Sequence, residues 1–160
     1  MTRRLILTGP VGTGKTTALQ QLIQRHPDRF AGILAPVIHH QRHLQDVSTG
    51  ELRLLEVPPA APDALPVGKY VFSATVFVWA RKRLSEQAAL FPQRWLILDE
   101  VGKLEVQGKG LAPVAMQILR SDWVNNLIVV IRDSLLQHVT ENLQRQYAII
   151  HQEELKNIVF

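Results

Sequence analysis

The chain has 160 residues, a formal net charge of +4 and no cysteine. This length suits a single domain over residues 1–160, and the lack of cysteine excludes disulfides and thiolate metal sites. No run approaches the roughly 18 apolar residues that a membrane span needs, and Leu5–Leu7 is too short for a signal peptide. We therefore expect a cytoplasmic protein. Its positive charge favours an anionic partner, which nucleotide phosphates would satisfy without requiring nucleic acid.

In the first part of the chain, apolar runs alternate with helical spacing. Between residues 44 and 56, polar and apolar residues alternate around the turn signal Ser48-Thr49-Gly50, which is typical of a β-hairpin. The predicted elements are, in chain order, a strand over 3–8, a helix that contains Leu19, Leu22 and Ile23 and ends before Pro27, a strand over 32–38, the hairpin over 44–56 and a proline-rich loop over 58–66.

The second part continues the alternation of strands and helices. Its predicted elements are a strand over 70–72, a helix over 74–91 with Ser73 as N-cap, a strand over 95–98, an amphipathic helix over 111–119, a strand over 127–131, a helix over 134–143 and a strand over 147–150. Such alternation predicts an α/β fold, with a mostly parallel sheet covered by helices on both faces. Ligands of these sheets bind beyond the carboxyl ends of the strands.

A glycine-rich segment follows the first predicted strand and opens a helix. It matches G-x-x-x-x-G-K-[ST] in full and reads Gly9-Pro10-Val11-Gly12-Thr13-Gly14-Lys15-Thr16, followed by Thr17. In this P-loop, glycines let the backbone N–H groups point at phosphates, and the helix N-terminus favours the anion. We expect Lys15 to bind the β- and γ-phosphates and the Thr16 hydroxyl to ligate Mg²⁺. The segment therefore predicts a site for a nucleoside triphosphate with magnesium.

Two carboxylates follow the apolar strand at 95–98. P-loop proteins hold magnesium with a second acid, and Asp99 stands where this Walker B aspartate is expected. Hydrolysis also needs a group that orients or deprotonates water, and Glu100 is suited to this role as general base. Neighbouring side chains diverge at a strand end, so one carboxylate can face the metal and the other the γ-phosphate.

The P-loop with Thr16-Thr17 and the later segment Ile97-Leu98-Asp99-Glu100-Val101-Gly102-Lys103-Leu104-Glu105 resemble a known family. It is the small P-loop nucleoside-triphosphatase family, which includes proteins from thermophiles and the human cancer-related nucleoside-triphosphatase. The resemblance covers most of the chain and implies a RecA-like fold with an inserted antiparallel hairpin. It also implies magnesium-dependent hydrolysis of several nucleoside triphosphates, ATP and GTP among them, with Glu100 as base. The chain departs from many relatives around the hairpin, where they carry Gly-Phe and an arginine-rich glycine pattern.

Two further cations are candidates for stabilising charge in the transition state. Arg132 follows the strand at 127–131, which a RecA-like order places between the P-loop strand and the Walker B strand. The alternative is a surface arginine before a helix capped by Asp133 or Ser134. Lys103 is a second candidate, with a phosphate-sensing role.

Three functions remain open at this point. The leading hypothesis is a nucleoside triphosphatase, because adjacent Asp99 and Glu100 favour activation of water. A small nucleotide or metabolite kinase is the first alternative, although its expected arginine-rich lid is not evident from the widely spaced Arg120, Arg132 and Arg145. The second is a slow, nucleotide-switched module that acts on a nucleic-acid or protein partner.

Overall fold

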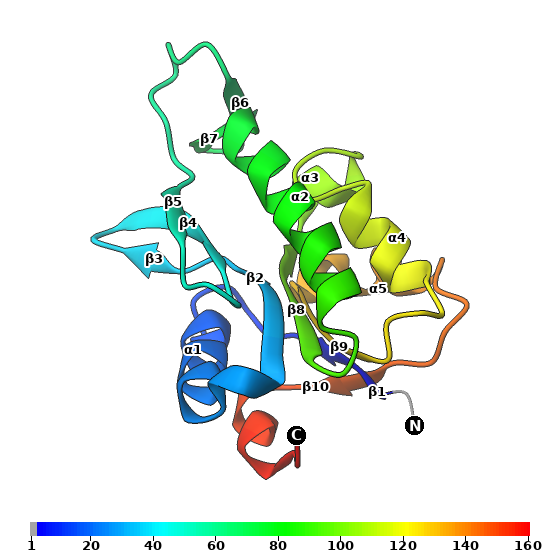
Figure 1. Ribbon diagram of the computed structural model, residues 1–160. Coiled ribbons are helices and arrows are strands. Elements are labelled where there is room, and N and C mark those ends of the chain that lie inside the picture. Colours follow the sequence, from blue (N-terminus) through cyan, green and yellow to red (C-terminus); the bar gives the residue numbers. More distant parts are fainter. Residues whose placement is uncertain (1–2) are drawn as a thin grey trace.

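The structure is a computed structural model that describes residues 3–160 (Figure 1). Its central sheet has eight strands. Their order across the sheet is β10 (Ala148–Ile150), β1 (Arg3–Leu7), β9 (Asn126–Ile131), β8 (Trp95–Val101), β2 (Phe30–Leu34), β4 (Gln41–Asp46) and β3 (Val37–Ile38), with β5 (Leu52–Leu54) paired to β4. The five strands from β10 to β2 are parallel, and the remaining pairs are antiparallel. The predicted fold class, a mostly parallel sheet with an inserted antiparallel hairpin, is confirmed.

Helices cover both faces of the sheet. Successive side chains of a strand point to opposite faces, so each face has its own hydrophobic core, which helices cover. On one face, Leu5, Leu7 and Ile97 pack against α1 (Lys15–Arg25) and the short helix η2 (Gln152–Asn157). On the other face lie α2 (Ala74–Leu90), α3 (Lys103–Val106), α4 (Val114–Arg120) and α5 (Asp133–Thr140). A short 3₁₀ helix, η1 (Pro27–Arg29), leads into β2. No helix within residues 3–160 has the length and apolar character needed to cross a membrane.

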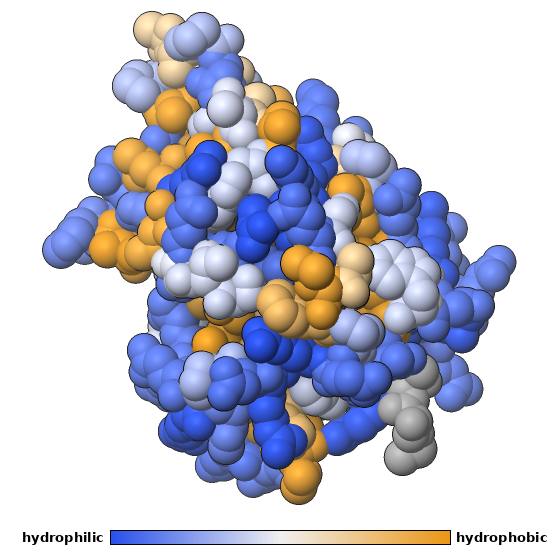
Figure 2. Space-filling view, viewed as in Figure 1, coloured by the Kyte–Doolittle hydropathy of each residue, from blue (hydrophilic) through white to orange (hydrophobic). Residues whose placement is uncertain are grey.

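The inserted hairpin begins earlier than the sequence indicates. The strand expected over 32–38 ends at Leu34, and the chain then forms β3 and β4, joined by a turn at His39 and His40. Both histidines have positive φ, 49° and 62°, which a two-residue hairpin turn demands. Glycine and asparagine normally occupy such turns, so the sequence carried no turn signal there. Figure 2 shows hydrophobic atoms gathered over this region, where Val37, Leu52 and Leu54 are exposed.

Other boundaries also differ from the predictions. The expected proline-rich loop over 58–66 contains a strand, β6 (Ala64–Val67), which pairs with β7 (Tyr70–Ser73) as a separate two-stranded hairpin. Pro66 is tolerated there because β6 is an edge strand. The helix expected over 134–143 ends at Thr140, and the one expected over 111–119 begins at Val114. Ser73 caps α2 as predicted, accepting a hydrogen bond from the Val76 N–H.

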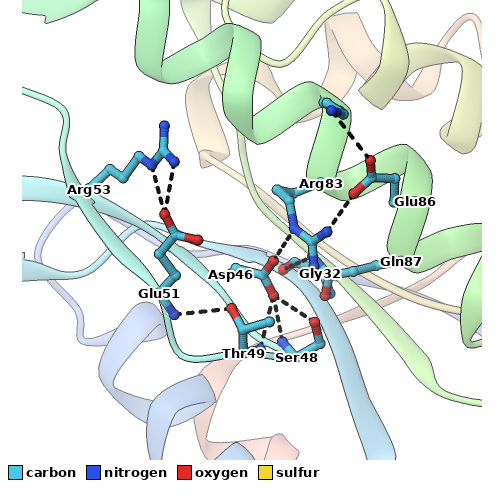
Figure 3. Close-up of polar contacts among 10 residues, drawn as sticks. Gly32, Asp46, Ser48, Thr49, Glu51, Arg53, Arg83, Glu86 and Gln87 are labelled. Atoms are coloured by element: carbon cyan, nitrogen blue, oxygen red, sulfur yellow. Dashed lines mark hydrogen bonds and ion pairs between the residues drawn. The ribbon is translucent and has the colours of Figure 1, made fainter.

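Helix α2 is tied to the sheet by the two buried polar groups in Figure 3. The Gln87 amide donates to the Gly32 carbonyl (3.0 Å) and accepts from the Gly32 N–H (2.7 Å). The Asp46 carboxylate accepts from Arg83 Nε (2.5 Å) and from the backbone and hydroxyl of Ser48. Burial alone would raise the pKa of Asp46, but these hydrogen bonds outweigh it and lower the pKa. The contacts fix β4, and therefore the hairpin, against α2.

Removing Arg83 should destabilise the fold. Arg83→Gln leaves the fully buried Asp46 without its counter-charge, and such losses cost about 3 kcal/mol or more. We expect urea unfolding at neutral pH to show a loss of this size, while Lys82→Gln, at an exposed neighbouring position, changes little. Because the folded pKa of Asp46 is lowered, its stabilisation exists above the unfolded value of 3.8 and disappears as the pH falls through the folded value. Equal stability of the two variants would contradict this role.

Candidate active site

The P-loop connects β1 to α1 at the carboxyl end of the sheet. Gly9, Gly12 and Gly14 have positive φ values of 152°, 78° and 86°, so the loop takes a conformation that side chains rarely permit. Lys15 is buried, and its Nζ donates to the carbonyls of Gly9 (3.0 Å) and Pro10 (2.8 Å). The ammonium group therefore lies folded over the loop that is predicted to wrap the phosphates.

The predicted magnesium ligands meet. The Thr16 hydroxyl, at the start of α1, donates to Asp99 Oδ2 over 2.8 Å, and the Ala35 N–H donates to the same oxygen over 3.0 Å. Asp99 is only 2% exposed. Burial, together with the neighbouring charge of Glu100, raises the pKa of Asp99 to about 6. The carboxylate is therefore short of positive charge around it, as expected for a group that receives a cation.

Glu100 and Arg132 also meet, at the ends of neighbouring strands. Strand β9 lies between β1 and β8, as the sequence predicts, and this brings Arg132 beside Glu100. Arg132 Nε and one terminal nitrogen each lie 3.1 Å from Glu100 Oε1. The Arg132 side chain is 30% exposed and that of Glu100 is 22% exposed. Arg132 is thus part of the site and not a free surface arginine. The neighbouring Asp133 accepts a hydrogen bond from the Thr8 hydroxyl.

A cavity of about 300 Å³ unites these groups. Its lining combines the P-loop with both carboxylates and includes Gly12, Lys15, Thr16, Asp99, Glu100 and Arg132. Arg42 on β4 also lines it, which the sequence analysis missed, because Arg42 reaches the site only through the pairing of the inserted hairpin with β2. No motif marks this residue. Lys103, in contrast, is exposed at the start of α3 and does not line this cavity.

The Glu105 side chain is bonded to backbone groups beside the site. Its Oε2 accepts from the Gly102 N–H (2.9 Å) and its Oε1 from the Leu111 N–H (3.0 Å). Burial raises the pKa of Glu105, opposed by these backbone hydrogen bonds. The side chain thereby holds the turn after α3 against the end of β8. The last acid of the sequence motif shapes the wall of the site and does not enter the triphosphate cavity.

The fold and the loop define an α/β protein of the P-loop NTPase class. The chain belongs to the family described as NTPase, whose model matches residues 4–158. It is therefore an enzyme of the nucleoside-triphosphatase type, a hydrolase. A relative called nucleoside-triphosphatase THEP1, from Caldivirga maquilingensis, is 25% identical, and the match covers 79% of this chain and 81% of the relative. The crystal structure of THEP1 from the hyperthermophile Aquifex aeolicus has the same fold. It superposes with a TM-score of 0.74 at 21% identity, over 98% of this chain and 96% of that one.

Neutralising Asp99 should stabilise the protein while harming its site. A folded pKa of about 6, against 3.8, means that the folded state binds the proton more tightly, so stability falls as the pH rises through that window. The ionised group costs about 3 kcal/mol of folding stability at neutral pH. We expect Asp99→Asn to raise the melting temperature by several degrees at pH 7 without magnesium or nucleotide.

The pH dependence of the gain provides the check. The difference in melting temperature should shrink as the pH falls through about 6 and disappear below 3.8, where Asp99 is protonated in both states. Asp28→Asn, at an exposed position in η1, serves as the control and should give no such gain. A destabilised Asp99→Asn at neutral pH would show that the buried charge is already compensated.

Proposed function

We propose that the chain hydrolyses nucleoside triphosphates, ATP and GTP among them, to the diphosphate and phosphate in a magnesium-dependent reaction. The contact between Thr16 and Asp99 carries this proposal, because it places two oxygen ligands beside a P-loop lysine, with Glu100 next to them. The name of the Caldivirga relative supports triphosphates as substrates. Breadth of substrate is consistent with a loop that contacts phosphates through backbone groups, which read no base.

The residues fit magnesium. A hydroxyl and a carboxylate are hard oxygen ligands of the kind that Mg²⁺ prefers, and few protein ligands suffice because phosphates and water supply the rest. The raised pKa of Asp99 reflects a buried charge that a divalent cation would balance. Thr16 and Asp99 would hold the ion, which when bound neutralises charge on the phosphate oxygens.

The remaining residues have separate tasks in this proposal. Lys15 and the P-loop N–H groups hold the β- and γ-phosphates. Both contacts of Arg132 use Oε1 of Glu100, which leaves Oε2 to accept a proton from the attacking water. In this proposal Arg132 orients the base, and its charge stabilises the negative charge that develops on the transferring phosphoryl group. Arg42 adds a second cation to the same cavity.

The first test concerns binding. Lys15→Ala removes a charge-assisted contact to the phosphates worth roughly 2–3 kcal/mol, so triphosphate affinity should fall by tens of fold. Calorimetric titration with magnesium and a non-hydrolysable ATP analogue measures this. Lys109→Ala, at an exposed position outside the cavity, is the control. Unchanged affinity in a folded Lys15→Ala protein would refute the phosphate-site assignment.

The second test separates binding from chemistry. Glu100→Gln is nearly isosteric but cannot take a proton efficiently, so it should bind triphosphate and magnesium while hydrolysis falls by roughly 10²-fold or more. Phosphate release under single-turnover conditions, beside a binding titration, makes the measurement. Turnover at the wild-type rate would assign the base role to another group.

The third test concerns the arginine. We expect slow basal hydrolysis, with Arg132→Ala lowering kcat more than it weakens triphosphate binding, as for an interaction made mainly in the transition state. Steady-state kinetics with a parallel titration provide both numbers. Arg42→Ala is the natural comparison, since it removes a cation from the same cavity without touching Glu100. If kcat is unchanged in Arg132→Ala and falls in Arg42→Ala, the hairpin arginine has the role proposed for Arg132.

A further inference from the structure

A second cavity, of about 230 Å³, lies on the other side of Glu100. It is bounded by the two hairpins and α3, which Figure 1 shows at the same end of the central strands. Arg42, Glu100 and Arg132 line both this cavity and the triphosphate cavity. The proposed base therefore forms part of the boundary between two spaces, and a molecule in the second would meet the γ-phosphate end of the first.

One part of the wall of the second cavity is apolar and aromatic. They include Leu44, Leu55, Tyr70, Phe72, Phe77 and Leu111. Cavities of about 150 Å³ lined by such residues accept benzene. A volume of about 230 Å³ therefore holds one substituted aromatic ring, or an aliphatic body of similar size. An apolar wall combined with a few polar and charged groups is typical of a site for a small organic ligand.

The charges around the cavity favour an anionic ligand. Arg42, Lys69 and Lys103 line it, and within residues 3–160 none of these three forms an ion pair. Three carboxylates also line the cavity: Glu105 accepts from backbone N–H groups, Asp99 accepts from Thr16, and Glu100 pairs with Arg132. With Arg132, the four cations of the lining outnumber its three carboxylates, so the cavity favours a negatively charged ligand.

We propose that this cavity binds a phosphoryl acceptor, namely a small organic anion with an apolar, ring-sized body and a hydroxyl group. The inference rests on the proposed triphosphate site. Glu100 takes the proton of the acceptor hydroxyl, whose oxygen forms a bond to the γ-phosphorus. The bond from that phosphorus to the β,γ-bridging oxygen breaks, and the diphosphate leaves with its electron pair. The products are a phosphomonoester, the nucleoside diphosphate and one proton, which Glu100 returns to solvent. Hydrolysis is the same step with water as nucleophile.

The probe for the test is 4-(hydroxymethyl)benzoate, which combines a ring, a carboxylate and a primary hydroxyl. We expect it to bind the full chain in the presence of magnesium and ATP, as measured by calorimetric titration, and to yield its phosphomonoester, as measured by ³¹P NMR. 4-Methylbenzoate, which lacks the hydroxyl, should bind without being phosphorylated and should slow phosphate release by displacing water from Glu100. Absence of binding, or binding without phosphomonoester while phosphate is still released, would overturn the acceptor assignment.

Two tryptophan variants locate the effect. Val67→Trp introduces a large side chain at the wall of the second cavity and should weaken probe binding at least tenfold. Val78→Trp places the same side chain at an exposed position on α2 that lines neither cavity, and should behave as the wild type. Wild-type probe affinity in Val67→Trp would place the probe elsewhere and refute the site. If the wild type releases no phosphate even without probe, the proposed hydrolysis is wrong. That result differs from failure of the acceptor site alone, in which phosphate is still released.

Discussion

The Asp99 carboxylate joins three parts of the molecule that the chain supplies separately. It ends the apolar run of β8, accepts a hydrogen bond from Thr16 at the start of α1, and accepts another from the backbone at Ala35, where β2 ends. Each element is thereby placed relative to the P-loop. The arrangement is costly, because a nearly dry carboxylate is kept with little positive charge around it. Such a cost at a ligand site is typical of a fold that is completed by what it binds.

The elements that the sequence predicts well are those determined locally. A strand that leads into a glycine-rich loop and a helix has a pattern contained within some twenty residues, and so does an apolar strand that ends in two acids. The parallel core and the meeting of Thr16 with Asp99 therefore follow from the sequence. The turn at His39 and His40 does not, because these residues take positive φ under the constraint of the strands on either side. Strand β6 is not predicted either, because prolines in and before it are typical of a loop.

What the sequence could not reveal depends on contacts between distant segments. Arg42 reaches the site because β4 pairs with β2, and β4 is also fixed to α2 through Asp46 and Arg83, which are 37 positions apart. Glu105 lies within a motif, yet its burial against the Leu111 backbone shows that it supports the turn after α3. The pairing of Arg132 with Glu100 was foreseeable only by assuming the strand order. In each case the residue type is visible in the sequence, but its partner is set by tertiary packing.

The position of Glu100 between two cavities links hydrolysis to the choice of nucleophile. Glu100 lines the phosphate site and also the second cavity, one wall of which is apolar and aromatic. A ligand seated against that wall would displace water from beside Glu100 and Arg132, which would strengthen their interaction with developing charge and slow attack by water. If that ligand carries a hydroxyl group, it would gain the stronger electrostatic interaction and would itself replace water as the nucleophile. The predicted slow hydrolysis and the proposed acceptor site would therefore both follow from one geometry, in which Glu100 faces two cavities.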